Sequence, residues 1–313
     1  MREPCCFDKS PGLINLAMDV VVPHSLQTMA FPLPTLPLRP ADGHKGTFGR
    51  ISIIGGSVGM SGAVCLASVA ALRSGSGLVT AVVPRAIQSI VAAFEPCIMT
   101  VGLIDNPEFG LLALSSADAA ILTNGRDAVG IGPGLGENEA AATLVRDVLK
   151  CAACPLVLDA DALNVAARHC LLTTDRNASS CVITPHPGEF ARLTGRSIED
   201  VEQHREEAAV EFAVTHRVIV VLKGPGTIVT DGTHLYRNTT GNSGMGTGGS
   251  GDVLTGILTS LLGQGLPALN AAAIAVHVHG LAGDIAAERF TQRGMIASDL
   301  LNCLPEAWRQ LGA

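Results

Sequence analysis

The chain has 313 residues, enough for one large α/β domain or two small ones with a substantial core. Its net charge of −7 and lack of a long basic stretch exclude the charge pattern of nucleic-acid-binding proteins. No uninterrupted apolar run reaches the roughly 18 residues of a membrane span, and the N-terminus lacks a signal-peptide pattern, so we expect no membrane contact.

Residues 1–40 differ in composition from the rest of the chain. Pro32–Pro40 alternates proline with apolar residues, which is typical of an extended, polyproline-like conformation. We interpret residues 1–40 as a Pro-rich arm without a catalytic role, packed on the domain or on a neighbouring subunit. Residues 41–313 then form the folded domain.

From Gly49 onward, short β-branched runs alternate with Ala-rich helical stretches. Strands are expected at Arg50–Gly56, Leu78–Pro84, Asp127–Gly132, Pro155–Asp161, Cys181–Pro185 and Val218–Gly224. Helices are expected at Ala63–Gly75, after the strand Leu78–Pro84 as far as Phe94, and at Ser250–Leu262, Ala268–Arg289 and Ala297–Gln310. A hairpin turn is expected at Asp231–Gly232. This alternation predicts an α/β fold whose mainly parallel sheet is covered on both faces, with ligands bound beyond the carboxyl ends of the strands.

Nine cysteines, an odd number without the spacing of metal ligands, favour a cytoplasmic protein. Cys151 and Cys154 form a lone CxxC pair, which is either a redox or metal pair or simply two ordinary thiols. We favour ordinary thiols because no second pair accompanies them.

The strongest motif is NSGMGTGGSGD (Asn242–Asp252), which runs into an apolar helix. Glycines such as Gly248, Gly249 and Gly251 let backbone N–H groups point into one concavity, where the helix dipole also favours an anion. We interpret this glycine nest as the phosphate site of a nucleotide. It is not a Walker loop, because no Gly-Lys-Ser/Thr follows. Asp252 is either a helix-favoured acid or, as we prefer, the base that accepts a proton from a hydroxyl attacking a phosphoryl group.

A second glycine-containing segment follows the strand that ends at Lys223. Gly224, Pro225, Gly226 and Thr227 would let the backbone approach a nucleotide's ribose or phosphates, unless they form only a strand–turn–strand connection.

Polar side chains follow two further strands. His186, between two prolines, is a candidate substrate contact or a helix cap, and Glu189 opens the next helix. Asp159 and Asp161 could hold water bound to Mg²⁺ or a ligand hydroxyl, or cap a helix. Asn164 lies in the same segment.

Two more glycine-rich turns, Gly55–Ala63 and Gly130–Glu137, are expected to form walls of the same site, with Glu137 at the start of a helix. Either turn could be only a tight strand-to-helix connection. For His277, His279 and Asp284 we favour packing or surface roles over metal ligation.

Together these segments closely resemble the ADP/ATP-dependent NAD(P)H-hydrate dehydratase family, a branch of the ribokinase-like superfamily with a three-layer α/β/α fold. The likeness covers roughly residues 45–305, and the combination of PHPGE, DADALN and GMGTGGSGD is its most specific part. It implies phosphorylation of the hydroxyl of (S)-NADHX or (S)-NADPHX from ADP or ATP, followed by loss of phosphate to restore NADH or NADPH. It also implies Mg²⁺ carried by the nucleotide, with Asp159 or Glu189 as candidate ligands through water, and a homotetramer.

Residue by residue, the resemblance places the hydrate contacts at Ala63, Gly134 or Gly136, His186 and Asp252. It places the adenine nucleotide on Lys223–Thr227 and Gly251, beside Gly248 and Gly249 of the glycine nest.

Many members of the family carry an N-terminal epimerase domain where this chain has only the Pro-rich arm. We therefore expect a separate epimerase to interconvert the R and S hydrates, and we favour ADP as the donor because the arrangement resembles stand-alone bacterial members. Two alternatives remain: an alcohol kinase of the hydroxyethylthiazole or hydroxymethylpyrimidine type, and a nucleotide sensor without turnover. The presence of Asp252 disfavours the sensor.

Overall fold

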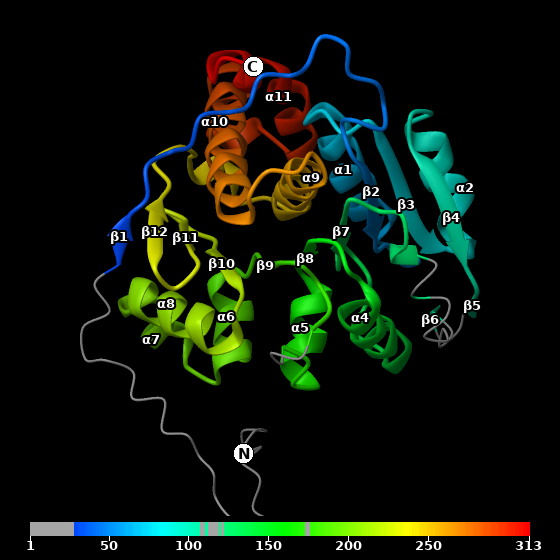
Figure 1. Ribbon diagram of the computed structural model, residues 1–313, viewed down its shortest axis with the longest axis horizontal. Coiled ribbons are helices and arrows are strands. Elements are labelled where there is room, and N and C mark those ends of the chain that lie inside the picture. The colour runs from blue at the N-terminus through cyan, green and yellow to red at the C-terminus, as the bar shows by residue number, and fades with distance from the viewer. Residues whose placement is uncertain (1–27, 107–109, 112–118, 120–121, 173–175) are drawn as a thin grey trace, which may run out of the picture.

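The computed structural model describes residues 28–106, 110–111, 119, 122–172 and 176–313 (Figure 1). Its central sheet has the strand order β1-β12-β11-β10-β9-β8-β7-β2-β3-β4. The strands are β1 (Met29–Ala30), β2 (Arg50–Ile54), β3 (Leu78–Pro84), β4 (Met99–Leu103), β7 (Ala128–Ile131), β8 (Leu156–Leu158), β9 (Cys181–Ile183), β10 (Ile219–Leu222), β11 (Ile228–Thr230) and β12 (His234–Arg237). A separate short pair is formed by β5 (Asp105–Asn106) and β6 (Gly110–Leu111).

The sheet is mainly parallel, as predicted. Strands β4, β3, β2, β7, β8, β9 and β10 run in parallel, whereas β11 pairs antiparallel with both β10 and β12. The predicted hairpin at Asp231–Gly232 is confirmed, since these residues connect β11 and β12. Strands β1 and β4 were not among the predicted strands.

Helices cover both faces of the sheet (Figure 1). One layer contains α1 (Ser61–Arg73), α2 (Arg85–Phe94), α9 (Ser250–Gly263), α10 (Ala268–Gly294) and α11 (Ala297–Gln310). The other contains α4 (Glu139–Cys151), α5 (Asp161–Arg168), α6 (Pro187–Thr194), α7 (Ile198–Gln203) and α8 (Arg205–His216). Successive residues of a strand pack against opposite helix layers: Ile53 packs with the first layer and Ile54 with the second. The predicted three-layer α/β/α fold is therefore confirmed.

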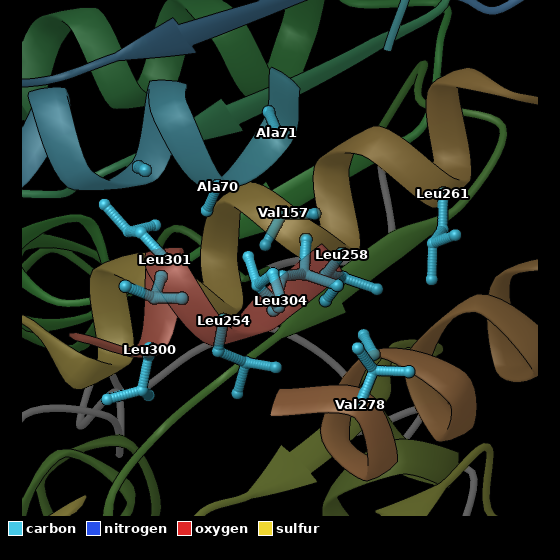
Figure 2. Packing of buried hydrophobic residues seen from close by; sticks show 14 of the residues in the cluster. Ala70, Ala71, Val157, Leu254, Leu258, Leu261, Val278, Leu300, Leu301 and Leu304 are labelled. Atoms are coloured by element: carbon cyan, nitrogen blue, oxygen red, sulfur yellow. The ribbon is translucent and has the colours of Figure 1, made fainter. Parts of the chain in front are cut away.

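Close packing between α1 and α9 fixes the position at which α9 begins. A Cβ atom at Gly256 would lie 2.0 Å from the carbonyl oxygen of Ala67 and 2.8 Å from the Cβ of Ala70, so only glycine allows this approach. Figure 2 shows the side chains that meet here, with Ala70 of α1, Leu254 of α9 and Leu301 of α11 among those labelled. The glycine nest at the start of α9 is thus held by a buried, tightly packed helix.

Helix α10 is long and apolar enough, by length and composition alone, to cross a membrane, although 61% of the relevant window is buried within the fold. It packs against α9 and α11. Polar residues such as His277 and Asp284 interrupt its sequence, so it contains no uninterrupted apolar run of membrane-spanning length. Its apolar character is that of a core helix in this fold.

The described part of the N-terminal arm, residues 28–40, lies along the domain. Met29 and Ala30 pair in parallel with β12, and Phe31, Leu33 and Leu36 pack against the core between α1, α9, α10 and α11. The other arm residues, 1–27, lie outside the described residues. The proposed domain boundary at residue 40 stays a prediction.

Candidate active site

The predicted site residues gather beyond the carboxyl ends of the parallel strands. Strand β2 pairs with β3 on one side and β7 on the other, so the chain changes direction across the sheet at this point. Such a switch point opens a crevice in which α/β proteins bind ligands. The loops after β2 and β7 meet here, where the Gly56 amide donates a 2.7 Å hydrogen bond to the Pro133 carbonyl.

The glycine nest has the geometry of an anion site. Gly249 is the N-cap of α9 in a left-handed conformation (φ 94°), and no side chain caps the helix. The first N–H groups of a helix have no partner within it. The Ser250 amide donates a 3.4 Å bond to the Thr247 carbonyl, whereas the Gly251 and Asp252 amides donate to no described residue, so these two remain available to phosphate oxygens. Asp252 is the third residue of α9 and lies in its first turn.

Asp252 combines burial with the lack of a fixed partner. Burial, followed by the negative charge of Asp159, raises the pKa of Asp252 to about 7, although Lys223 opposes this. Within the described residues, no hydrogen bond or ion pair holds its carboxylate. A carboxylate of this pKa can accept a proton near neutral pH.

A buried ion pair lies beside Asp252. The Lys223 ammonium lies 2.8 Å from Asp159 Oδ1, and the Thr255 hydroxyl donates a 2.6 Å hydrogen bond to Asp159 Oδ2. Asp159 is only 1% exposed. Burial alone would raise the pKa of Asp159, but Lys223 and Thr255 hold it below its usual value. Burial alone would likewise lower the pKa of Lys223, but Asp159 and Glu189 raise it.

Because Asp159 and Glu189 raise the pKa of Lys223, its side chain carries a positive charge in the site. A Cβ at Gly251 would lie 3.2 Å from the Lys223 nitrogen, which puts the ammonium next to the glycine nest. It can add positive charge to a bound phosphate while neutralising Asp159.

The side chains around this ion pair offer few free oxygen ligands for Mg²⁺. Both oxygens of Asp159 are already hydrogen-bonded, and Glu189 Oε2 accepts a 2.7 Å bond from the His186 amide. Among the described residues, no group of three or more His, Cys, Asp or Glu side chains could hold a metal ion. This donor set fits an ion that arrives on the phosphates of a nucleotide better than one held by the protein alone.

His186 takes the helix-capping role that was one of its two predicted roles. Its Nδ1 accepts bonds from the amides of Gly188 and Glu189, and Glu189 bonds back to the His186 amide in a capping box. Burial and the nearby Lys223 charge lower the pKa of His186, so the ring is neutral at pH 7. Its role as a substrate contact stays a prediction.

Ala63 and the GPGLG loop form one wall. Gly134 has φ 62°, and a Cβ there would lie 3.1 Å from that of Ala63. The Gly136 amide donates a 2.8 Å bond to Asp161 Oδ2, which ties the loop to the start of α5. Asp161 thus has a structural partner, and Asn164 accepts a bond from Arg192.

The segment after Lys223 forms the turn between β10 and β11. Gly224 and Gly226 both have positive φ, and Gly224 and Pro225 are exposed. The turn is open to solvent, and nucleotide contact there, including that of Thr227, stays a prediction.

The start of the helix after Gly130–Glu137 was predicted wrongly. Helix α4 begins at Glu139 with Asn138 as its N-cap, because the Asn138 side chain accepts a bond from the Ala141 amide. Glu137 lies outside the helix and pairs with Arg168.

The late histidines have packing roles, as favoured. His279 Nε2 lies 2.8 Å from the Ser250 carbonyl in the first turn of α9, and burial lowers the pKa of His279 to about 4. The neutral ring therefore donates to that carbonyl and helps to position the glycine nest. His277 lies 3.3 Å from the Tyr236 hydroxyl, and Asp284 accepts a bond from the Gly241 amide.

Thr255 and His279 are contributions to the site that the sequence did not indicate. Thr255 lies in an apolar helix and His279 in an Ala-rich one, and neither adjoins a glycine-rich loop. Neither Cys151 nor Cys154 forms a disulfide with a described residue.

Comparison with known proteins agrees with this geometry. The profile of the NAD(P)H-hydrate dehydratase family matches residues 51–306. The bifunctional NAD(P)H-hydrate repair enzyme of Moorella thermoacetica is 44% identical over 289 residues, which cover 91% of this chain and 54% of that protein. The ADP-dependent (S)-NAD(P)H-hydrate dehydratase of Bacillus subtilis is 34% identical over 279 residues, 88% of this chain and 95% of that protein.

Among solved structures, the ADP/ATP-dependent NAD(P)H-hydrate dehydratase from Bacillus subtilis, co-crystallized with ATP/Mg²⁺, has a TM-score of 0.76 and 31% identity. The match covers 88% of this chain and 95% of that one. The chain spans about half the length of the bifunctional relatives that it matches. From the family profile and these similarities, we conclude that the chain belongs to the NAD(P)H-hydrate dehydratase family.

Proposed function

We propose that this chain dehydrates (S)-NADHX and (S)-NADPHX to NADH and NADPH, with ADP as the phosphoryl donor. The observation that carries the proposal is the position of Asp252: a partly buried carboxylate of pKa about 7, without a fixed partner, in the first turn of the uncapped helix α9. Membership of the NAD(P)H-hydrate dehydratase family and the similarity to the ADP-dependent (S)-NAD(P)H-hydrate dehydratase of Bacillus subtilis support this substrate and this donor.

The first step is phosphoryl transfer. The Asp252 carboxylate takes the proton of the hydrate hydroxyl while that oxygen forms a bond to the terminal phosphorus of ADP and AMP departs. Amides at the start of α9 and the Lys223 ammonium stabilise the negative charge on the transferring group. Mg²⁺ bound to the phosphates would supply further charge neutralisation.

The second step is elimination. The ring nitrogen contributes its lone pair as the carbon–oxygen bond breaks and phosphate leaves with the bonding electrons. Loss of a proton from the neighbouring ring carbon then restores the double bond. Phosphate leaves far more readily than hydroxide, which is why phosphorylation is useful. The sum is hydrate plus ADP giving the dihydronicotinamide nucleotide, AMP and inorganic phosphate.

We propose further that the protein works in the cytoplasm as a homotetramer, beside a separate epimerase that supplies the S hydrate. Seven cysteines lie in the described residues and none of them forms a disulfide there, which supports a reducing compartment. Apolar side chains exposed on α2 and on the outer strand β4, including Phe94, Met99 and Val101, support contact between subunits. Analytical ultracentrifugation tests the tetramer.

The decisive experiment incubates the protein with (S)-NADHX, Mg²⁺ and either ADP or ATP. Absorbance of the reduced nicotinamide and release of inorganic phosphate should rise together, and faster with ADP. A stable phosphorylated product without recovery of absorbance would replace this function by an alcohol kinase. Nucleotide binding without any product would indicate a sensor.

A further inference from the structure

A cavity of about 690 Å³ lies at the far end of α9 from Asp252. Gln264, which follows α9, lines it, and lies twelve positions after Asp252, a rise of about 18 Å at roughly 1.5 Å per residue. The arm residues Leu36–Pro40 form one wall, and the ends of α9 and α11 form others. The cavity is therefore separate from the candidate active site.

Two polar groups of the cavity wall are buried and lack partners. Ser74 and Trp308 are 7% and 8% exposed, and both line the cavity. Within the described residues, neither the Ser74 hydroxyl nor the Trp308 indole N–H makes a hydrogen bond. The two polar atoms are almost inaccessible to solvent, so they do not face the open space of the cavity, and a molecule bound there meets the Trp308 ring rather than its N–H.

The charged side chains of the wall are all cationic. Arg39, Arg73 and Arg309 line the cavity, and no acidic side chain does. None of the three forms an ion pair with any described residue. Arg39 is held in place, because it donates a 2.9 Å bond to the Gly75 carbonyl and stacks 3.6 Å above the Phe48 ring. Unpaired guanidinium groups at a concave surface favour an anion.

Much of the remaining wall is apolar. Leu36, Leu261 and Leu266 line it together with the ring of Trp308. The volume lies within the range of about 300–1,000 Å³ that is usual for small-molecule sites.

We propose that this cavity binds a small anionic amphiphile, a molecule with one carboxylate, sulfate or phosphate group on an apolar body. The arginines bind the anionic group, and the leucines and Trp308 contact the body. The proposal does not depend on the reaction proposed above.

Trp308 is the only tryptophan of the chain, so its fluorescence reports on this cavity directly. The full chain is titrated with octanoate, octyl sulfate and neutral octanol, each below the concentration at which it aggregates. Both anions should change the emission saturably, with an affinity about tenfold or more above that of octanol. An equal response to octanol, or no saturable change, would overturn the proposal.

A double variant, Arg73→Gln with Arg309→Gln, removes two charges without breaking an ion pair of the described residues. It should weaken octanoate binding about tenfold and leave octanol binding unchanged. The matched control is Arg146→Gln on α4, in the opposite helix layer, which should bind octanoate as the wild type does. Circular dichroism and thermal unfolding verify that each variant is folded.

Unchanged octanoate affinity in the folded double variant would also overturn the proposal. So would an emission spectrum that shifts with protein concentration in the absence of a probe, because a second copy of the chain would then cover the cavity. Asp252→Asn should bind octanoate normally, which separates this site from the active site.

Discussion

Lys223 and Asp159 form a buried ion pair, 2.8 Å between Nζ and Oδ1, that joins the ends of β10 and β8 beneath the start of α9. Its two charges act on Asp252 in opposite directions: Asp159 raises the pKa of Asp252 and Lys223 lowers it. These two opposing effects on the pKa of Asp252 partly cancel, and burial is the main reason why this pKa is about 7. The charge balance at this site depends on both partners.

Lys223→Ala should raise the Michaelis constant for the nucleotide, because the ammonium beside the glycine nest is lost. It should also lower the free energy of unfolding by about 3–5 kcal/mol, since Asp159 is left buried without its counter-charge. Steady-state kinetics and urea unfolding measure the two effects. Adding Asp159→Asn to this variant should recover part of the stability but not the nucleotide affinity. An unchanged Michaelis constant in the single variant would remove Lys223 from the nucleotide site.

Asp252→Asn should lower turnover by roughly 10²–10⁴-fold while leaving the nucleotide's dissociation constant within a few fold of wild type. The amide has nearly the shape of the carboxylate, but it cannot accept the hydroxyl proton. Phosphate release measures turnover, and calorimetry measures nucleotide binding. Wild-type turnover in this variant would show that another group, or water, takes the proton.

The same substitution should make the protein more stable at pH 8. The folded-state pKa of Asp252, about 7, lies above its usual value of 3.8, so the folded protein holds this proton more tightly than the unfolded chain. The stability that this provides is present below about pH 4 and is lost as the pH rises to about 7. At pH 8 the ionised carboxylate therefore destabilises the folded protein. Asp252→Asn should raise the free energy of unfolding at this pH by on the order of 2–4 kcal/mol. Urea unfolding at pH 8 and pH 4 tests this, because the gain should nearly vanish at pH 4.

Ionisation of Asp252 should determine the acid limb of the pH profile of kcat/KM. Because the base must be ionised, kcat/KM should rise about tenfold per pH unit below about pH 7 and level off above it. The pKa of His186 is lowered, so that ring loses its proton at a lower pH than its usual value and does not explain a limb near 7. His186→Asn, which can still cap α6, should keep the limb in place. If the acid limb shifted to another pH in this variant, the limb would report ionisation of His186 rather than of Asp252.

Those parts of the site that are local in sequence could be predicted from it. The glycines of the nest and Asp252 are contiguous and run into an apolar helix, so their geometry follows from the start of α9. The contacts of Asp159 could not be predicted, because Lys223 and Thr255 reach it from 64 and 96 residues away. Each of these residues is a single polar position beside an apolar run, and only the assembled fold brings them together.

The same distinction applies to the strands. The central strands were predicted because they are buried on both faces and appear as continuous β-branched runs. Strand β4 lies at the sheet edge with alternating exposed residues, and β1 has only two residues. Thr100 and Gly102 interrupt the apolar residues of β4, so it shows no continuous apolar run. Strand β1 is too short to identify and is a strand only because β12 lies beside it.

Two glycines of the same segment, Gly248 and Gly256, should respond to alanine in opposite ways. A Cβ at Gly248 would meet no atom within 4 Å, so Gly248→Ala should change the free energy of unfolding by less than about 0.5 kcal/mol. It should nevertheless weaken nucleotide binding, because a methyl group would stand beside the amides that bind phosphate. Gly256→Ala has no space, since its Cβ would lie 2.0 Å from the Ala67 carbonyl oxygen.

Forcing α1 and α9 apart should therefore destabilise the Gly256→Ala protein by about 1–3 kcal/mol, despite the better helix propensity of alanine. Its nucleotide affinity at low temperature, where it stays folded, should fall less than that of Gly248→Ala. Urea unfolding and calorimetric titration with ADP measure both properties for each variant. If Gly248→Ala bound ADP with wild-type affinity, the phosphates would not lie on the glycine nest. The proposal that the reacting groups lie beside Asp252 would then be wrong.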